Sequence, residues 1–399
     1  MHLPRTVLTT ALLAALYVPA AHAEVAIDVI AGSEITFEGL LQADGNWFHN
    51  DVADLNGNSN NGNDSEFELR RAELILKGKG PGNIDWVVGY DAKADKFLDT
   101  NLRYKFGGNA ATFLQAGQFK QPNSLEELSS TKNNDFISKA TVTNTFALGR
   151  RLGVAYGTGQ DNWSLTGSAF GRELTRNLAH GSGYALRGTF APLMESGQVL
   201  HLGLSWADYD TDADTLRLRA RPNADLATVR LVDSGELRDT DRMRTIGAEL
   251  MYLHGPLKLQ AEYFDASVKR YDHGDYSSSG YYLSGVWNLT GESWGYKGGV
   301  PTTGLPSEPA SGQWQLAARF DHIDLNDGSV NTAAAIPVVD GVLGGKMDVW
   351  TVGVNWYWRS NFRTSLNYAM ADSSKYSSSA GGFVDDKPSS VQARLQFFW

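Results

Sequence analysis

The sequence predicts an all-β fold in which sixteen antiparallel strands close into a barrel that spans a membrane. After residue 33, nearly every segment alternates apolar and polar residues with a period of two, and none keeps a helical stripe. The segments are about ten residues long and separated by turns, which indicates a transmembrane barrel and not a soluble sandwich with shorter, more varied strands. Aromatic residues gather at segment ends, as in Trp47-Phe48 and Trp356-Tyr357-Trp358, where two interfacial girdles need them.

The first 23 residues are expected to be a secretory signal peptide. Arg5 lies in a short n-region, an apolar stretch runs from Val7 to Val18, and Ala21-His22-Ala23 has the small residues of a cleavage site. We therefore expect the exported chain to begin at Glu24, so that residues 24–399 form the barrel.

The alternating segments number sixteen, and a single-chain bacterial barrel requires an even number. The expected strands span residues 34–44, 66–77, 83–93, 97–106, 110–120, 148–158, 162–171, 183–191, 199–208, 242–254, 256–266, 279–290, 312–324, 347–358, 361–371 and 389–399. Tight turns such as Gly80-Pro81-Gly82-Asn83 then fall on the periplasmic side, whereas the outer loops are 49–65, 121–147, 209–241 and 372–388. The connection 291–311 becomes a long periplasmic loop.

Residues Leu216 to Arg221 also alternate, but counting them as a barrel strand would make the total odd. We place them in the outer loop 209–241, as a short internal strand folded back into the vestibule.

The last segment alternates up to Trp399 and resembles the recognition signal of bacterial outer-membrane barrels. It also provides a partner for the first strand, because a barrel in lipid leaves no edge unpaired.

Composition narrows the function classes. The chain has 399 residues, no cysteine and a formal net charge of −10. Without cysteine, disulfide scaffolds, cysteine-ligated zinc and thiol catalysis are excluded. The acidic balance lacks the electrostatic footprint of a nucleic-acid-binding protein, and beyond the N-terminus no apolar run is long enough for a membrane-spanning helix.

Several segments, in this order and spacing, resemble the phosphate-selective porins O and P of Gram-negative bacteria, and polyphosphate-selective porin O in particular. They are Phe37 to Gln42, Arg70 to Leu74, Gly117 to Glu127, Arg219 to Pro222, Asp233 to Gly235, Gly280 to Leu283, Thr290 to Glu292 and Val352 to Tyr357. The resemblance implies a homotrimer of sixteen-stranded barrels in outer-membrane lipid that conducts phosphate, pyrophosphate or polyphosphate. It also implies an arginine ladder that leads to a constriction lined by lysine and arginine, with loop 121–147 bent into the barrel.

A phase change in the second strand singles out Arg70 and Arg71. Phe67 and Leu69 put the apolar face on odd positions, whereas from Ala72 onward it is even. A β-bulge at the arginine pair would explain the change and would aim both guanidinium groups into the lumen. Their planar donors suit a phosphate oxyanion. Alternatively, the pair neutralises nearby glutamates in an ordinary charged pore wall.

Other basic residues are candidates for the anion path. Lys120, Lys132 and Lys139 are candidates for the constriction, and Arg217, Arg219, Arg221 and Arg230 for the outer ladder. Alternation puts Arg217, Arg219 and Arg221 on one face, about 6.5 Å apart. Ordinary solvated loop charge is the alternative, and the aspartates at 208, 210, 212 and 214 are close enough in sequence to neutralise the ladder.

Glu73 departs from the family pattern, in which we expect an aromatic residue two positions after the arginine pair. A carboxylate there would repel phosphate and pair with an arginine, so a general or weakly anion-preferring porin, including one for sugars or other small solutes, stays open.

The sequence contains none of the common catalytic or nucleotide-binding motifs. The run 210–214 imitates a calcium loop, but Thr215 replaces the required glycine. We therefore expect no cofactor and no metal, and an outer-membrane enzyme or adhesin is the least favoured class.

Overall fold

The computed structural model describes residues 25–399 except 31–32, 58–62, 176–180, 305 and 332–336. The predicted signal peptide and its cleavage site lie outside the described residues. Within the described chain, no helix is both long and apolar enough to cross a membrane.

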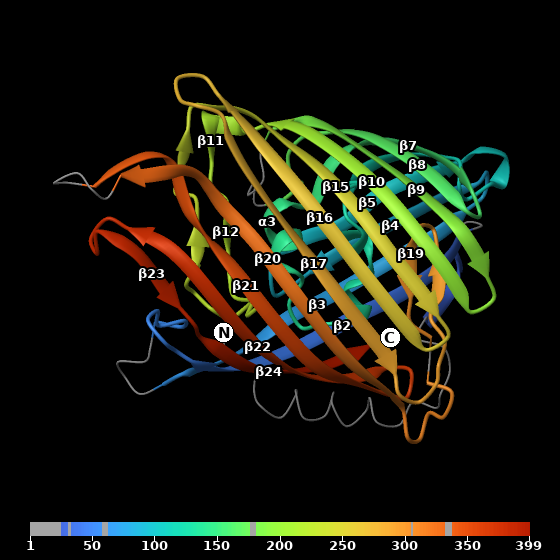
Figure 1. The fold of residues 1–399 in the computed structure, drawn as a ribbon. Coiled ribbons are helices and arrows are strands. Elements are labelled where there is room, and N and C mark those ends of the chain that lie inside the picture. The colour runs from blue at the N-terminus through green and yellow to red at the C-terminus, as the bar shows by residue number, and fades with distance from the viewer. Residues whose placement is uncertain (1–24, 31–32, 58–62, 176–180, 305, 332–336) are drawn as a thin grey trace, which may run out of the picture.

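The predicted fold is confirmed, because one antiparallel sheet curves round and closes when its last strand pairs with its first (Figure 1). The sixteen strands of the wall are β2 (Ser33–His49), β3 (Ser65–Gly80), β4 (Ile84–Asp91), β5 (Lys96–Lys105), β6 (Phe113–Lys120), β7 (Arg150–Gln160), β8 (Trp163–Phe170), β9 (Gly183–Glu195), β10 (Gln198–Asp210), β15 (Thr240–His254), β16 (Leu257–Arg270), β17 (Tyr276–Asn288), β20 (Gln313–Asn331), β21 (Val338–Trp358), β22 (Phe362–Ser377) and β24 (Ser389–Phe398). Two short additions, β1 (Val25–Ile30) on β2 and β23 (Gly382–Asp386) on β22, bring the described sheet to 18 strands.

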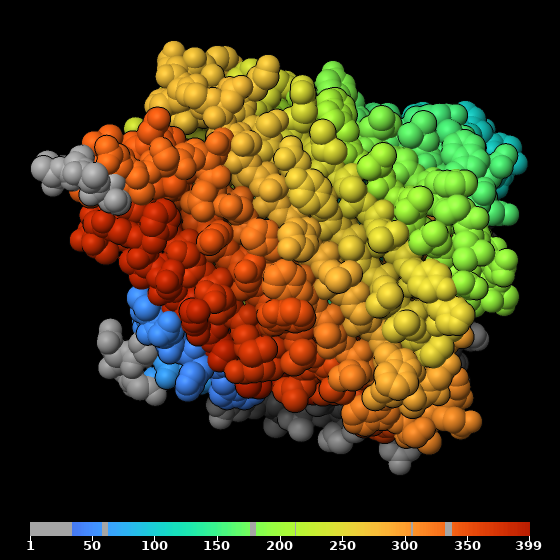
Figure 2. Space-filling view, viewed as in Figure 1, coloured from blue at the N-terminus to red at the C-terminus, as the bar shows by residue number. Residues whose placement is uncertain are grey.

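Alternation along each strand separates an outward apolar face from an inward polar one. On β10, Leu202 and Leu204 are 43% and 66% exposed, whereas His201 and Ser205 on either side of them are buried. Figure 2 shows the continuous outward surface of the later strands. Exposed apolar side chains on the outside and buried polar ones inside are what a barrel in lipid requires.

Three segments fold into the lumen from its ends. The constriction loop, residues 121–147, contains α2 (Leu125–Leu128), η4 (Thr131–Asn133) and α3 (Thr141–Phe146). The long loop, residues 211–239, contains η5 (Asp212–Asp214), β11 (Thr215–Leu216), β12 (Arg219–Ala220), β13 (Val232–Asp233) and β14 (Leu237–Arg238). As predicted, the alternating residues 216–221 stay out of the wall, and the short strands of this loop pair with one another.

The third segment explains the unexpectedly long connection after β17. It carries a hairpin of two short strands, β18 (Gly295–Lys297) and β19 (Val300–Thr302). The other connections at this end of the barrel, such as the one that contains η3 (Phe106–Gly108), are short turns. Trp294 is buried against the Lys258 ammonium, 4.0 Å from the centre of its ring, and the Arg187 guanidinium donates to the Gly299 carbonyl at 3.0 Å. The connection is long because it fills part of the lumen.

The inward segments pack mainly against one side of the barrel. A large apolar cluster joins α3 and the long loop to inward side chains of β15, β16, β17, β20, β21 and β22. A second cluster joins α2 and the hairpin to β9, β10 and β15. The remaining open space therefore lies along β2 to β7.

Closure of the barrel places Trp399 directly on Gly39. The two residues exchange backbone hydrogen bonds of 3.1 and 3.2 Å, and the Trp399 ring contacts those of Phe37 and Phe397. A Cβ atom at Gly39 would lie 2.1 Å from the Trp399 ring and would displace it.

Deleting Trp399 should reduce the yield of folded barrel, because closure loses two backbone hydrogen bonds and an aromatic contact, a cost of about 2–3 kcal/mol. Electrophoretic mobility after refolding into lipid measures the folded fraction. Leu395→Ala is the control, since this outward side chain is 64% exposed and leaves the closing pair intact. Equal folding of the truncated chain and the parent would contradict this account of closure.

Candidate functional site

Three chambers lie inside the barrel along the wall on the β2 to β7 side. The arginine chamber, about 400 Å³, lies toward the long loops. Thr131 borders both it and the middle chamber, and the middle chamber shares Lys77, Arg103 and three other residues with a turn-end chamber near the tight turns. Because neighbouring chambers share lining residues, the three lie in a row along the wall, and we call this row the path.

The arginine chamber is strongly basic. Its lining includes eight basic side chains, Arg70 and Arg71 from β3, Lys139 from the constriction loop, Arg217, Arg219, Arg221 and Arg230 from the long loop, and Arg394 from β24. Asp225 is the single acidic residue in the lining that the structure describes. Seven of the nine residues singled out in the sequence therefore meet here, although the wall and two different loops supply them.

The predicted bulge at Arg70 and Arg71 is confirmed. Gln42 of β2 pairs with Arg71 and the next residue, Ala43, pairs with Leu69, which leaves Arg70 without a partner in the register. Both arginines line the same chamber. The extra residue is what allows two successive side chains to face the lumen.

The two arginines have different carboxylate partners. Arg70 donates from Nη2 to Asp225 of the long loop at 3.1 Å, whereas Arg71 donates from Nη1 to Glu73 on its own strand at 3.1 Å. Glu73 is buried and lines the middle chamber, whereas Arg71 lines the arginine chamber.

The ladder arginines are only partly neutralised. Arg217 forms a two-point ion pair with Asp233, at 2.8 and 2.6 Å. Among the described residues, Arg219, Arg221 and Arg230 have no carboxylate within ion-pair distance. Burial and the positive charges of Arg221 and Arg219 lower the pKa of Arg230 to about 10. The chamber therefore holds closely spaced cations that repel one another.

Of the four aspartates that are close enough in sequence to neutralise the ladder, Asp208 faces outward. Asp208 lies on the lipid side of β10 and pairs with Arg242 and Arg244 of β15. Asp233, inside the long loop, is the carboxylate that reaches the ladder.

The three candidate lysines serve different purposes. Lys120 donates to the Glu127 and Ser129 carbonyls at 2.5 and 3.0 Å, and Lys139 pairs with the Glu127 carboxylate. Burial opposes ionisation of Glu127, but Lys139 and Lys120 outweigh it and lower the pKa of this carboxyl to about 2. Lys132 lines the middle chamber, its ammonium 5.7 Å from the Phe398 ring centre.

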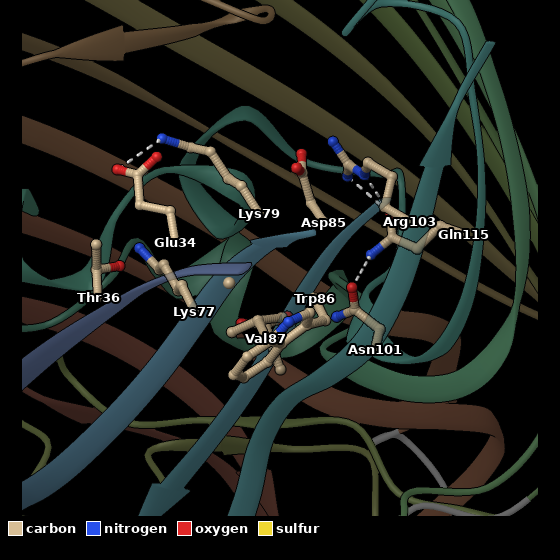
Figure 3. A pocket seen from close by; sticks show the side chains of 12 residues that line it. Glu34, Thr36, Lys77, Lys79, Asp85, Trp86, Val87, Asn101, Arg103 and Gln115 are labelled. Carbon is tan, nitrogen blue, oxygen red and sulfur yellow. Dashed lines mark hydrogen bonds and ion pairs between the residues drawn. The ribbon is translucent and has the colours of Figure 1, made fainter. Parts of the chain in front are cut away.

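Charge becomes balanced toward the tight turns. The described lining of the middle chamber has five basic residues (Lys77, Arg103, Lys120, Lys132 and Arg150) and three acidic ones (Glu38, Glu73 and Asp99). The turn-end chamber, shown in Figure 3, has three of each, with Lys79 near Glu34 and Arg103 on Gln115. The positive field is therefore concentrated at one end of the path.

Two members of the arginine chamber were missed in the sequence. Arg394 forms a two-point ion pair with Asp44 across the closing strands, both contacts at 2.6 Å. Its position on the polar face of the last strand was the available signal. The sequence carries no signal for Asp225, because only the fold of the long loop brings this residue to Arg70.

Inward carboxylates hold the constriction loop in place. Glu262 of β16 accepts the backbone N–H groups of Leu125 and Glu126 at 2.9 and 2.7 Å. Asp321 of β20 accepts the N–H of Thr141 at 2.8 Å, and Arg319 donates to the Ser138 carbonyl at 3.1 Å. The loop that was expected to bend inward is thus fixed to the far wall.

A closed sixteen-stranded barrel narrowed by an inward loop, with a polar path along one wall, is the architecture of an outer-membrane porin. The family model described as phosphate-selective porin O and P matches residues 41–399. The chain belongs to this family.

Two relatives and one solved structure resemble the chain. An uncharacterized protein of Caulobacter vibrioides is 30% identical over 336 residues, which are 76% of this chain and 62% of that protein. Porin O of Pseudomonas aeruginosa is 28% identical over 235 residues, 54% of this chain and 52% of that protein, so each match spans less than two thirds of the relative. The trimer form of OmpT, an outer-membrane protein of Vibrio cholerae, has the same fold, with a TM-score of 0.57 and 10% identity over 92% of this chain and all of that one.

Replacing Glu262 with Gln should loosen the constriction loop. The amide NH₂ would face one of the two loop N–H donors, and a buried donor without an acceptor costs about 1–3 kcal/mol. Single-channel recordings should show larger current and more frequent fluctuations.

Asp265→Asn is the matched control, because Asp265 lies on the same strand and faces outward. A Glu262→Gln pore with the conductance and noise of the parent would mean that other contacts suffice to hold the loop.

Proposed function

We propose that the protein is a passive, non-enzymatic diffusion channel for anions that favours phosphate, including pyrophosphate and short polyphosphates. One observation carries the proposal: eight basic side chains and one carboxylate line the described chamber on the path. An anion that loses part of its hydration shell on entering the chamber regains favourable interactions through charge-assisted hydrogen bonds to these side chains. We also propose that residues 1–23 direct export and are cleaved, and that the long loops face the cell exterior.

Phosphate suits this chamber better than a spherical anion does. A guanidinium group presents several planar donors, and a tetrahedral oxyanion can accept from more than one arginine at once. Arg70 and Arg71 are adjacent on one bulge, and Arg221 and Arg230 line the same chamber from the opposite loop. The family's description as phosphate-selective and the similarity to Porin O support the same substrate class.

A general porin with weak anion preference is the second candidate. The Arg71–Glu73 ion pair favours it, because a carboxylate next to the arginines offsets part of their charge. The equal numbers of acidic and basic residues in the turn-end chamber point the same way.

We propose a homotrimer in which neighbouring subunits cover the side of the barrel formed by the short strands β4 to β8, which we call the low wall. Strands β4, β6 and β8 have 8 residues each, whereas β20 and β21 have 19 and 21. An eight-residue strand at the tilt of a barrel crosses about 20 Å of membrane, less than the apolar band of about 25 Å. The trimer form of the fold-mate OmpT is consistent with this arrangement.

Inorganic phosphate added to a chloride bath should block the current through single channels, and a salt gradient should give an anion-selective reversal potential. Replacing both Arg70 and Arg71 with Ala should raise the half-blocking phosphate concentration by about 10- to 100-fold, since two charge-assisted donors are lost together.

Replacing Arg217 and Arg219 with Ala should mainly slow the entry of phosphate and make the entry rate less sensitive to salt, because charges at the rim act by steering the anion.

Glu73→Gln tests the same site in the opposite direction and should strengthen the block. A pore whose current ignores phosphate in both the parent and Glu73→Gln would remove the phosphate assignment and favour the general porin.

The trimer is tested by native electrophoresis and cross-linking in detergent. Val154→Arg, on the outward face of the low wall where Val154 is 51% exposed, should yield monomers by placing a charge in the subunit contact. Leu283→Arg, an equally outward change on β17 where Leu283 is 58% exposed, should leave the trimer intact. A monomeric parent would contradict the proposed assembly.

A further inference from the structure

Asp225 is held in the arginine chamber in the way an oxyanion ligand is held. Its Oδ2 accepts from Arg70 Nη2 at 3.1 Å, and its Oδ1 accepts from Ser138 Oγ at 2.7 Å. One oxygen therefore receives a guanidinium donor from the wall, and the other a hydroxyl donor from the constriction loop. These two donor types also bind phosphate oxygens in proteins.

The backbone that carries Asp225 is fixed on both sides. Asn223 donates to Asp321 at 2.7 Å, its carbonyl accepts from Gln392 at 2.9 Å, and Ala224 is fully buried. On the other side, the Ala227 N–H donates to the Ala224 carbonyl at 3.1 Å, and Ala227 is also buried. The carboxylate can rotate about its side-chain bonds, but the packed loop keeps it at the chamber.

Further cations surround this carboxylate. Arg221 and Arg394 line the same chamber, and their charges act on Asp225. Burial disfavours its ionised form, but Arg70, Ser138 and Arg394 outweigh burial and lower the pKa of Asp225. Arg70 also retains a buried Nε without a partner among the described residues. The chamber therefore satisfies a resident negative charge and keeps unused donor capacity.

We propose that Asp225 is a tethered anion that occupies the phosphate position between Arg70 and Ser138, so that entering phosphate competes with it. The inference rests on the phosphate channel proposed above and identifies the residue that tunes it. Phosphate takes the donors on Arg70 and Ser138 as the carboxylate turns toward Arg221. When phosphate leaves, the carboxylate takes the two donors back.

This exchange allows a strongly basic chamber to release its ligand. A conduction site must attract an ion and still let it leave, and a cluster of arginines with no counter-charge would retain a phosphate. Because the tethered carboxylate replaces the departing anion, the half-buried Arg70 does not become an unpaired charge. Asp225 thus lowers affinity and shortens occupancy.

A purely structural ion pair has the opposite consequence. If Asp225 only held the long loop against β3, neutralising it would disorder the arginines and weaken phosphate binding. The direction of the change therefore distinguishes the two roles.

The test compares phosphate block of chloride current in the parent and in Asp225→Asn, with folding checked by electrophoretic mobility. Asparagine keeps an acceptor for the Ser138 hydroxyl but removes the negative charge that faces Arg70. The half-blocking concentration of inorganic phosphate should fall about tenfold, and single blocked events should lengthen, because loss of one charged competitor is worth about one decade. Asp225→Ser should shift the block in the same direction and serves if the Asn variant folds poorly.

Two controls isolate the mechanism. Asp208→Asn removes a carboxylate from two arginines on the outward face and should leave the block within about twofold of the parent. In an Arg70→Ala background, Asp225→Asn should have a much smaller effect, because the donor for which phosphate and Asp225 compete is absent.

An unchanged or higher half-blocking concentration in Asp225→Asn would overturn the tethered-anion role, even if phosphate blocks the parent as proposed. If phosphate blocks Asp225→Asn but not the parent, the inference stands and the parent is not a phosphate channel. If phosphate blocks neither, both proposals fail.

Discussion

The interior of this barrel depends on the polar face that the alternating strands present to the lumen. A loop folded into a closed barrel takes its backbone N–H and C=O groups away from water, and each needs a partner. Inward carboxylates and arginines provide these partners, as Glu262 does for α2 and Arg187 does for the hairpin at Gly299. The charged inner face of the wall therefore has two roles: it holds the inward loops in place, and it lines the path.

This requirement divides the basic residues into two groups. Lys120, Arg187 and Arg319 are committed to loop carbonyls or buried carboxylates. Arg219, Arg221 and Arg230 line the chamber and have no carboxylate partner among the described residues, although Arg221 and Arg230 each donate to a carbonyl of their own loop. The apolar clusters fill the opposite side of the lumen, which confines ions to the wall that carries the second group. Packing and selectivity thus depend on the same distribution of side chains.

Sequence periodicity was sufficient for the wall because the membrane imposes it. The strand number, the bulge at Arg70 and Arg71 and the internal placement of β11 and β12 all follow from which face must be apolar. The predicted ends were less accurate: the strand expected at 347–358 begins at Val338, since beyond the apolar band both faces are polar and the period of two disappears. The hairpin after β17 and the Asp225–Arg70 contact were missed, because both depend on tertiary packing between distant segments and leave no local pattern.

The net charge of the chain gives no information about the field along its path. The protein has 45 acidic and 35 basic residues, yet eight of the basic ones and a single acidic one line the arginine chamber. Charges on the outward face, such as Asp208 with Arg242 and Arg244, pair with each other on the side of the wall that faces away from the lumen. Inside the lumen, low-dielectric walls confine the field, so a few unpaired guanidinium groups outweigh a larger number of distant carboxylates. An acidic protein can therefore contain a path that favours anions, because the fold determines which charges face the lumen.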